Sequence, residues 1–386
     1  MRRILPVIVL SQFFCTSLWF AGNAIMPDMI QLLHLTPNFL AHLTSAVQFG
    51  FIVGTLVFAV LAISDRFSPS LVFCCCAIIA AGCNLGITII SINVTSILMF
   101  RFLTGFFLAG IYPVGMKIAS DYYQKGLGKS LGFLVGALVI GTAFPHFLKN
   151  STTNLPWKYV MYGTSILSIV GGLAMWLLVP NGPFRKRSPQ IAFSSFIVGF
   201  RNGHFRAAAI GYFGHMWELY TFWTFVPVML LAYHHHFPQV VLNIPFWSFL
   251  IIASGALACV CSGIISQYVA VKKVATICLF LSCACCLLSP LFLFNPSTTI
   301  FITFLFFWGL VVIADSPLFS TLVAQQAPVA ARGTSLTIVN CIGFSITIVS
   351  IQLLRIVSNM MDVKYAYLLL AVGPIIGLVA LLRNKG

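Results

Sequence analysis

The stretch Gly214-His215-Met216-Trp217-Glu218-Leu219-Tyr220 lies inside a long apolar run that extends from Ala207 to Tyr233. Glu218 is one of only six acidic residues in a chain of 386, and it falls near the middle of a candidate membrane span. An ionisable side chain at mid-bilayer depth costs a few kcal/mol, so it normally faces a partner or a cavity. His215 lies three residues earlier on the same helical face. The stretch therefore predicts a polar functional site inside a membrane-spanning helix.

The composition around this stretch is that of a membrane protein. The chain is 60% hydrophobic and 7% charged, whereas soluble domains are roughly 25% charged. Lys and Arg outnumber Asp and Glu by 21 to 6, but they stand singly or in small groups between apolar runs. Because no basic face or domain results, a nucleic-acid partner is excluded. Most of the 12 Cys residues lie in the apolar runs, where Cys behaves as a small hydrophobic side chain, and no disulfide is predicted.

Twelve apolar segments are long enough to cross a bilayer, which takes about 20 residues of helix. The first follows Met1-Arg2-Arg3 and is too long for the apolar region of a signal peptide. Because the number of spans is even, both termini are predicted to lie on the same side. The predicted spans are 4–28, 40–63, 70–92, 96–119, 129–148, 158–180, 206–232, 244–267, 273–294, 298–324, 334–356 and 364–383.

The distribution of Lys and Arg predicts that this side is the cytoplasm. With a cytoplasmic N-terminus, the inner segments hold 15 of these residues and the outer loops hold 4, as the positive-inside rule requires. The one long polar interruption separates a predicted N-terminal six-helix bundle (1–180), a cytoplasmic linker (181–205) and a C-terminal six-helix bundle (206–386). The Arg185-Lys186-Arg187 cluster of the linker is interpreted as an orientation signal, with anionic lipid head groups as an alternative partner.

Matching residues recur at a nearly constant offset in the two halves. Gly105 and Gly309 are 204 residues apart, and so are Pro113 and Pro317. Each match is weak alone, but together they indicate two similar halves with the same orientation. Parallel half-repeats of this kind are a known transporter architecture.

Two motifs resemble the major facilitator superfamily, and the resemblance covers essentially the whole chain. The loop after the second span reads Ser64-Asp65-Arg66-Phe67-Ser68, which keeps the Asp-Arg core of the family's loop signature but loses its glycines and trailing basic residues. The second copy, around Gln267, keeps a glycine and the basic residues but loses Asp-Arg. The fourth span contains the family's Arg-x-x-x-Gly pattern as Arg101-Phe-Leu-Thr-Gly105. The sequence from His215 to Tyr220 is similar to that of bacterial nitrate/nitrite and cyanate-type permeases. Nitrate porters bind the anion with an Arg in helix 2 and another in helix 8, and the second and eighth predicted spans of this chain contain no Arg.

The resemblance implies gating residues. Asp65 and Arg66 are expected to latch the inward-closed state, with a plain turn as the alternative. Gln267 takes the corresponding position in the second half. Pro317 is expected to kink the tenth span beside Asp315, because proline lacks an N–H and leaves a carbonyl one turn earlier without its donor. A carboxylate beside a kink suits a gate, although Asp315 could equally bond a neighbouring Ser or Thr.

The predicted proton or substrate site consists of Glu218 and His215, because a buried carboxyl group or an imidazole can exchange a proton near neutral pH. The alternative is a structural Glu–His hydrogen bond. Trp217 and Tyr220 are added as pathway residues because they neighbour Glu218 in the sequence. Asp315, next to the expected kink, completes the candidates of the second half.

The first half supplies further candidates. Arg101 is predicted to be a pathway charge, with snorkelling to the interface as the alternative. Asn23 and Asp28, at the outer end of the first span, are placed in the solute pathway because helix 1 lines the cavity in the family. Lys117 and Asp121 are spaced for a helical salt bridge.

The loop His234-His235-His236, in the second half, could bind a transition metal. Adjacent His residues do not share one helical or strand face, and no carboxylate lies nearby in the sequence. A metal site is therefore not expected.

Taken together, the sequence predicts an all-α integral membrane protein of 12 helices in two six-helix bundles with cytoplasmic termini. The resemblance implies a secondary transporter, not an enzyme, whose two bundles rock around a central solute site with proton coupling. No Gly-rich phosphate loop is present, so ATP does not drive it and no cofactor is expected. A proton-coupled drug exporter, a metal transporter, a non-transporting sensor and an intramembrane enzyme are the alternatives. The expected partners are a small solute, protons and membrane lipid, and the expected form is a monomer in a bacterial inner membrane.

Overall fold

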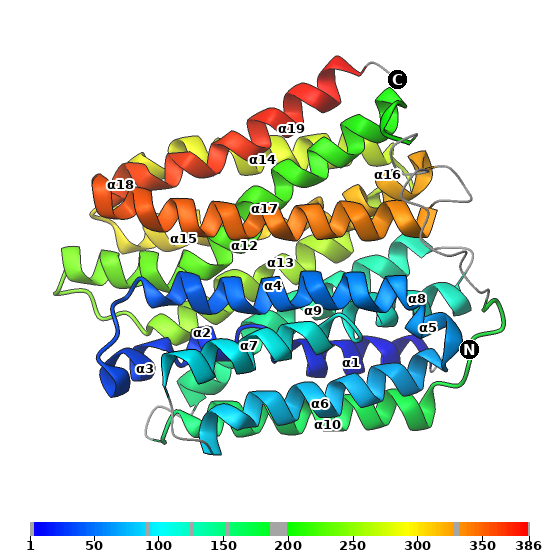
Figure 1. The fold of residues 1–386 in the computed structure, drawn as a ribbon. Coiled ribbons are helices and arrows are strands. Elements are labelled where there is room, and N and C mark those ends of the chain that lie inside the picture. The colour runs from blue at the N-terminus through cyan, green and yellow to red at the C-terminus, as the bar shows by residue number, and fades with distance from the viewer. Residues whose placement is uncertain are drawn as a thin grey trace. The chain divides into compact units, whose positions relative to one another are not determined.

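The computed structural model describes residues 4–89, 93–123, 127–151, 155–185, 199–327 and 332–384. All regular structure in these residues is helical (Figure 1). The chain divides into two compact units, which we call unit 1 (Met1–Ser188) and unit 2 (Pro189–Gly386). The predicted linker is described only in part, because residues 186–198 lie outside the described residues.

Unit 1 is a bundle of packed helices. Its α4 packs along α7, and its α6 packs between α7 and α10 (Figure 1). The described helices of unit 1 are α1 (Ile4–Thr16), α2 (Ala21–Ala24), α3 (Met26–Leu33), α4 (Phe39–Val60), α5 (Ile63–Arg66), α6 (Pro69–Ile89), α7 (Val94–Leu108), α8 (Tyr112–Tyr122), α9 (Leu127–Ser151) and α10 (Lys158–Leu178).

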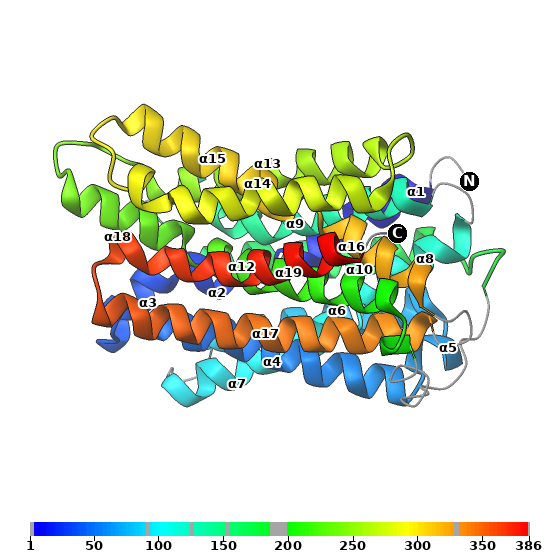
Figure 2. The same ribbon diagram turned by 90° about the horizontal axis from the view of Figure 1, so that it is seen from above.

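Unit 2 is arranged around α12, the helix that carries the stretch from Gly214 to Tyr220. This helix packs against α17 on one side and α19 on another (Figure 2). The described helices of unit 2 are α12 (Gly203–His236), α13 (Ile244–Ile265), α14 (Val271–Phe292), α15 (Thr298–Ala314), α16 (Ser316–Gln326), α17 (Arg332–Met360), α18 (Val363–Ala366), the 3₁₀-helix η2 (Tyr367–Ala371) and α19 (Val372–Arg383).

Ten helical segments of the described chain are long and apolar enough to cross a membrane. The count of 12 and the side on which the termini lie stay predictions. The shorter α1 falls below the required length, and the 34-residue α12 is not among the ten. Its Trp, Tyr, His and Thr residues lower its hydropathy.

Several predicted spans are broken helices rather than continuous ones. The first is interrupted at residues 17–20 and again at Ile25, so that Pro27 lies in the first turn of α3. The predicted end of this span at residue 28 is too early, because a proline in the first turn of a helix has no N–H to leave unpaired and the helix can continue past it. The span continues in helical form to Leu33.

The two halves share a second kind of break. Pro113 follows the interruption between α7 and α8, and Pro317 follows the interruption between α15 and α16. Each proline stands in the first turn of the helix after the break, where its fixed φ is compatible with the helix. The tenth predicted span is therefore interrupted at Asp315, two residues before Pro317.

The same offset also appears in helix packing. A Cβ added to Gly105 on α7 would lie 1.9 Å from the carbonyl oxygen of Val47 on α4. A Cβ added to Gly309 on α15 would lie 2.3 Å from the carbonyl oxygen of Ile251 on α13. Both glycines and both carbonyls are 204 residues apart. Glycine is therefore required at both crossings because two backbones approach each other without room for a side chain.

We expect Gly105→Ala to destabilise the protein by about 1–3 kcal/mol, since the added methyl group forces the two backbones apart. Gly82→Ala on α6 is the matched control, because a Cβ at Gly82 meets no atom within 4 Å. An exposed helical Gly→Ala change usually adds roughly 0.5–1 kcal/mol of stability. Thermal unfolding in detergent measures both variants. A Gly105→Ala protein as stable as the Gly82→Ala protein would contradict the close crossing.

Candidate functional site

Glu218 is buried in unit 2, where it is 1% exposed. Its Oε1 accepts a hydrogen bond from Ser282 Oγ on α14 and another from Trp308 Nε1 on α15, each at 2.6 Å. The Trp308 ring is packed against Phe222, with ring centroids 4.7 Å apart. Hydrogen bonds to a carboxylate are roughly twice as strong as those between neutral groups. The carboxyl group is thus held between three helices.

His215 has a different partner. Its Nδ1 lies 2.7 Å from Oδ1 of Asp315, and both side chains are 1% exposed. The Glu218–His215 hydrogen bond that was the alternative interpretation of this pair is not formed. Three residues on an α-helix are separated by roughly 60° around the axis, which is enough to direct the two side chains to different neighbours. Asp315 stands in the break between α15 and α16, and its carboxyl group contacts His215 rather than a nearby Ser or Thr.

Trp217 and Tyr220 point toward other helices. Trp217 Nε1 donates to the carbonyl of Leu369 in η2 at 3.0 Å. The Tyr220 ring lies 5.1 Å from the Phe344 ring of α17. These directions follow from helix geometry, because positions one and two residues from Glu218 are turned by roughly 100° and 200°. Neighbourhood in the sequence therefore does not bring these rings to the partners of Glu218, and their place in a pathway stays a prediction.

Arg101 is fully buried on α7 and does not snorkel. One of its terminal nitrogens donates to the carbonyls of Leu18 at 2.9 Å and Trp19 at 2.6 Å, in the break after α1. The other donates to Asn84 Oδ1 on α6 at 3.1 Å. Backbone carbonyls released by a helix break have no water to turn to in a membrane. Arg101 therefore supplies the donors that the broken first span lacks.

Asn23 and Asp28 are tied to neighbouring helices of unit 1. Asn23 Nδ2 donates to Thr44 Oγ1 on α4 at 2.9 Å. Asp28, on α3, forms an ion pair with Lys149 of α9 at 2.8 Å. Their assignment to a solute pathway is not decided by these contacts.

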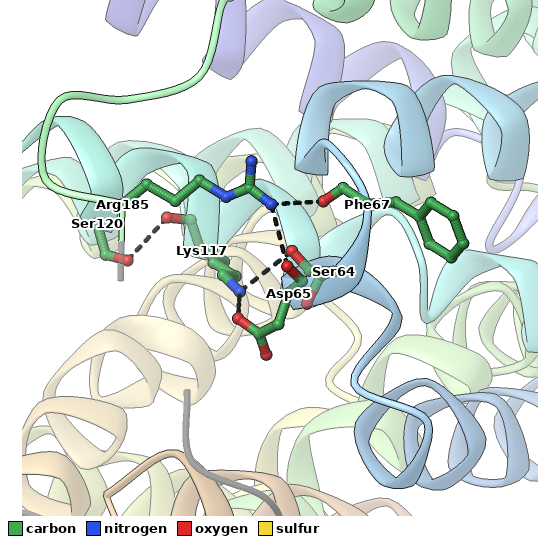
Figure 3. Close-up of polar contacts among 6 residues, drawn as sticks. All are labelled: Ser64, Asp65, Phe67, Lys117, Ser120 and Arg185. Carbon is green, nitrogen blue, oxygen red and sulfur yellow. Dashed lines mark hydrogen bonds and ion pairs between the residues drawn. The ribbon is translucent and has the colours of Figure 1, made fainter. Parts of the chain in front are cut away.

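Figure 3 shows a cluster of polar contacts at the turn that carries the Asp-Arg motif, which we call the Asp65 cluster. Lys117 Nζ on α8 donates to the side chain of Asp65 and, at 3.2 Å, to the carbonyl of Ser64. Arg185 donates to the carbonyls of Asp65 at 3.2 Å and Phe67 at 2.7 Å. Two cations from distant segments thus hold one turn in place.

The ion pair of Lys117 is therefore with Asp65, and the salt bridge expected with Asp121 is not the one that forms. Arg66 is exposed at the end of α5, and Gln267 is exposed in the turn after α13. The sequence offered no signal for Arg185, because its partners are backbone carbonyls. Asn84, Ser282 and Trp308 were also missed. Only Asn84, an amide in an apolar span, carried a signal that could have been used.

The three His residues at the end of α12 do not converge. His234 Nδ1 contacts the carbonyl of Val240 at 2.8 Å, whereas the His236 ring lies against Phe294, with centroids 5.3 Å apart. Among the described residues, no group of three or more His, Cys, Asp or Glu side chains could hold a metal ion.

Apolar helices of membrane-spanning length, with ionisable side chains buried inside them, define an integral multi-pass membrane protein. A model of the Major Facilitator Superfamily matches residues 8–351, and the chain belongs to that family. The fold is similar to the crystal structure of the human organic anion transporter MFSD10 (TETRAN), with a TM-score of 0.78 and 14% sequence identity. That match covers 98% of this chain and 99% of the other. A comparison with curated proteins finds no match. The family supports a membrane transporter that carries small molecules.

We expect Arg101→Lys to destabilise unit 1 by about 1–3 kcal/mol, because the single nitrogen of lysine cannot occupy both positions from which the guanidinium donates, so a buried oxygen loses its donor. Arg206→Lys is the matched control, since Arg206 is exposed on α12. Denaturant unfolding in detergent measures both. Equal stability of the two variants would show that the contacts of Arg101 with the first span contribute little.

Proposed function

We propose that this protein is a secondary transporter that exposes a small-solute site alternately to the two sides of the membrane and couples solute movement to protons. Family membership supports the transport. The proposed topology has 12 spans in two six-helix bundles joined by a linker at 181–205. The asymmetry of Lys and Arg supports cytoplasmic termini. We place the protein, as a monomer, in a bacterial inner membrane.

One observation carries the coupling. Glu218, His215 and Asp315 are each at most 1% exposed and lie within one bundle. Ionisable groups buried among apolar helices are costly and usually take part in proton or ion pathways. Glu218 and Asp315 are also close enough for their charges to interact. We propose Glu218 and His215 as proton-exchanging groups, with Trp217, Tyr220, Arg101, Asn23 and Asp28 along the solute pathway.

The solute class is best approached with a panel. The fold neighbour is named as an organic anion transporter, which supports including organic anions such as benzoate. The resemblance of the stretch around Glu218 to nitrate/nitrite and cyanate-type permeases adds nitrate and cyanate. The two buried carboxyl groups of unit 2 favour cations, represented by tetraphenylphosphonium, and a neutral sugar completes the set.

A proton-coupled drug exporter of the same fold is the alternative. Deletion of the gene distinguishes the two, because loss of an exporter lowers resistance to toxic compounds, whereas loss of an importer lowers uptake of a nutrient. A non-transporting sensor or an intramembrane enzyme would leave solute flux independent of Glu218.

We expect purified protein in liposomes to accumulate at least one panel solute when a pH gradient is imposed. Glu218→Gln should reduce this accumulation to the level of protein-free liposomes, because the amide keeps an oxygen for Ser282 and Trp308 but cannot release a proton. Flux of labelled solute measures both proteins.

Asp362→Asn is the matched control, since Asp362 is exposed and caps α18 through a contact with Lys364 N at 2.9 Å that Asn can also make. The control should transport like the wild type. Coupling is refuted if no panel solute responds to the gradient, or if Glu218→Gln responds as fully as the wild type.

We further propose that Asp65 and Arg66 act in gating, together with Gln267 and Pro317 in the second half. Asp65→Asn removes the charge that Lys117 meets and loosens the turn of the Asp65 cluster. We expect the maximal rate of pH-driven flux to fall several-fold while the half-saturating solute concentration changes by less than about twofold, because no solute contact is lost. An unchanged maximal rate would refute the gate.

A further inference from the structure

The side chain of Asp315 does not cap the helix that follows it, although its position in the sequence would allow this. Asp just before a helix is a favoured N-cap, whose side-chain oxygen accepts from the first free N–H groups. No such side-chain bond forms at the start of α16. The backbone carbonyl of Asp315 accepts from Leu318 N at 3.0 Å and from Phe319 N at 2.9 Å instead. The carboxyl group is therefore free to take another partner.

That partner is His215, and the contact leaves atoms unsatisfied on both sides. His215 Nδ1 lies 2.7 Å from Asp315 Oδ1 as an ion-pair contact, but neither carboxyl oxygen of Asp315 has a partner with hydrogen-bond geometry among the described residues. His215 Nε2 also has none. A buried polar atom without a partner costs about 1–3 kcal/mol. A contact that only held α12 against the helix break would need Nδ1 alone. It would not account for a buried Nε2 that has no partner.

The surroundings of the pair contain few titratable groups. Tyr212, on α12, lies against the His215 ring, and its hydroxyl donates to Asn340 Oδ1 on α17 at 2.6 Å. Cys259 on α13 donates its thiol to the carbonyl of Ile313 at 3.4 Å. Among the described residues, Cys278 on α14 and Glu218 on α12 also interact electrostatically with Asp315.

Glu218 differs from this pair in how its carboxyl group is occupied. The indole N–H of Trp308 can only donate a hydrogen bond. It therefore pairs with an unprotonated carboxyl oxygen and cannot accept a hydrogen from a protonated one. Ser282 adds a second donor to the same oxygen. His215 Nε2, by contrast, faces no competing donor or acceptor among the described residues. The two ionisable sites of unit 2 are therefore chemically distinct.

We propose that His215 and Asp315 form a proton-exchanging pair, separate from Glu218, in which Asp315 is a positioning residue and His215 Nε2 is the atom that gains and loses the proton. The neutral imidazole keeps its hydrogen on Nδ1, the nitrogen nearest Asp315, so that the lone pair lies on Nε2. On uptake, one N–H bond forms at Nε2 and an imidazolium faces a carboxylate. On release, that bond breaks and the proton leaves. This inference rests on the proposed proton coupling.

The first test reads the tautomer directly and needs no solute. Nitrogen NMR of protein labelled with ¹⁵N-histidine separates a protonated from an unprotonated ring nitrogen, and a spectrum of His215→Gln identifies the signals of His215. We expect the neutral form of wild-type His215 to carry its hydrogen on Nδ1. Asp315→Asn should lose this preference because the amide can present either a donor or an acceptor. Asp315→Glu, which keeps a carboxylate, should restore it.

The second test counts protons. Purified protein in weakly buffered detergent is titrated between about pH 8 and pH 5, the range in which an imidazole exchanges its proton. We expect His215→Gln to bind about one proton fewer than the wild type over this range. Asp362→Asn should match the wild type.

Several results would overturn the proposal: a hydrogen on Nε2 in neutral wild-type His215, the same tautomer in Asp315→Asn, or equal proton uptake by wild type and His215→Gln. Failure of the proposed function is a separate result, because it shows as an absence of pH-driven flux in wild-type liposomes. If flux responds to the gradient while the tautomer or the proton count disagrees, only the role of this pair is refuted.

Discussion

A polar group buried among apolar helices has to find its partner inside the protein, and the polar architecture of this chain depends on that constraint. The break after α1 releases the carbonyls of Leu18 and Trp19, and the guanidinium of Arg101 reaches across from α7 to meet them. The break before α16 leaves the carbonyl of Ile313 without its usual donor, because Pro317 has no N–H, and the thiol of Cys259 contacts it. Each break is thus served by a side chain from another helix.

The same helix breaks also bring polar and ionisable side chains together. A continuous apolar helix forms all its backbone hydrogen bonds internally and needs no polar group from its neighbours. An interrupted helix has free backbone groups that need donors or acceptors from other helices. In unit 1 this brings a cation into the bundle at residues 17–20. In unit 2 it brings a carboxyl group, that of Asp315, to an imidazole. Between the breaks, close crossings at Gly105 and Gly309 hold the helices at backbone contact, so that the polar groups are positioned by rigid packing rather than by loops.

Much of the fold could be predicted from residue order alone. Apolar runs of spanning length and the 204-residue offset of Gly105 and Gly309 pointed to helical halves, and the offset recurs in the crossings that these glycines make. The burial of Glu218 also followed, since an acidic residue in such a run has nowhere else to lie. The extension of the first span beyond Pro27 did not follow, because a proline can start a helix as readily as it ends one.

The sequence by itself determined that Glu218, His215 and Asp315 would be buried at a cost, because the length of apolar sequence needed to cross a bilayer depends only on composition and order. The tertiary structure decided which partners they meet. Neighbours on one helix differ in direction by roughly 100° per residue, so Glu218 bonds Ser282 and Trp308, which are 64 and 90 residues away. The stretch around Glu218 thus predicted one polar site. The packing of α14, α15 and α16 around α12 separates it into two sites, one at Glu218 and one at His215.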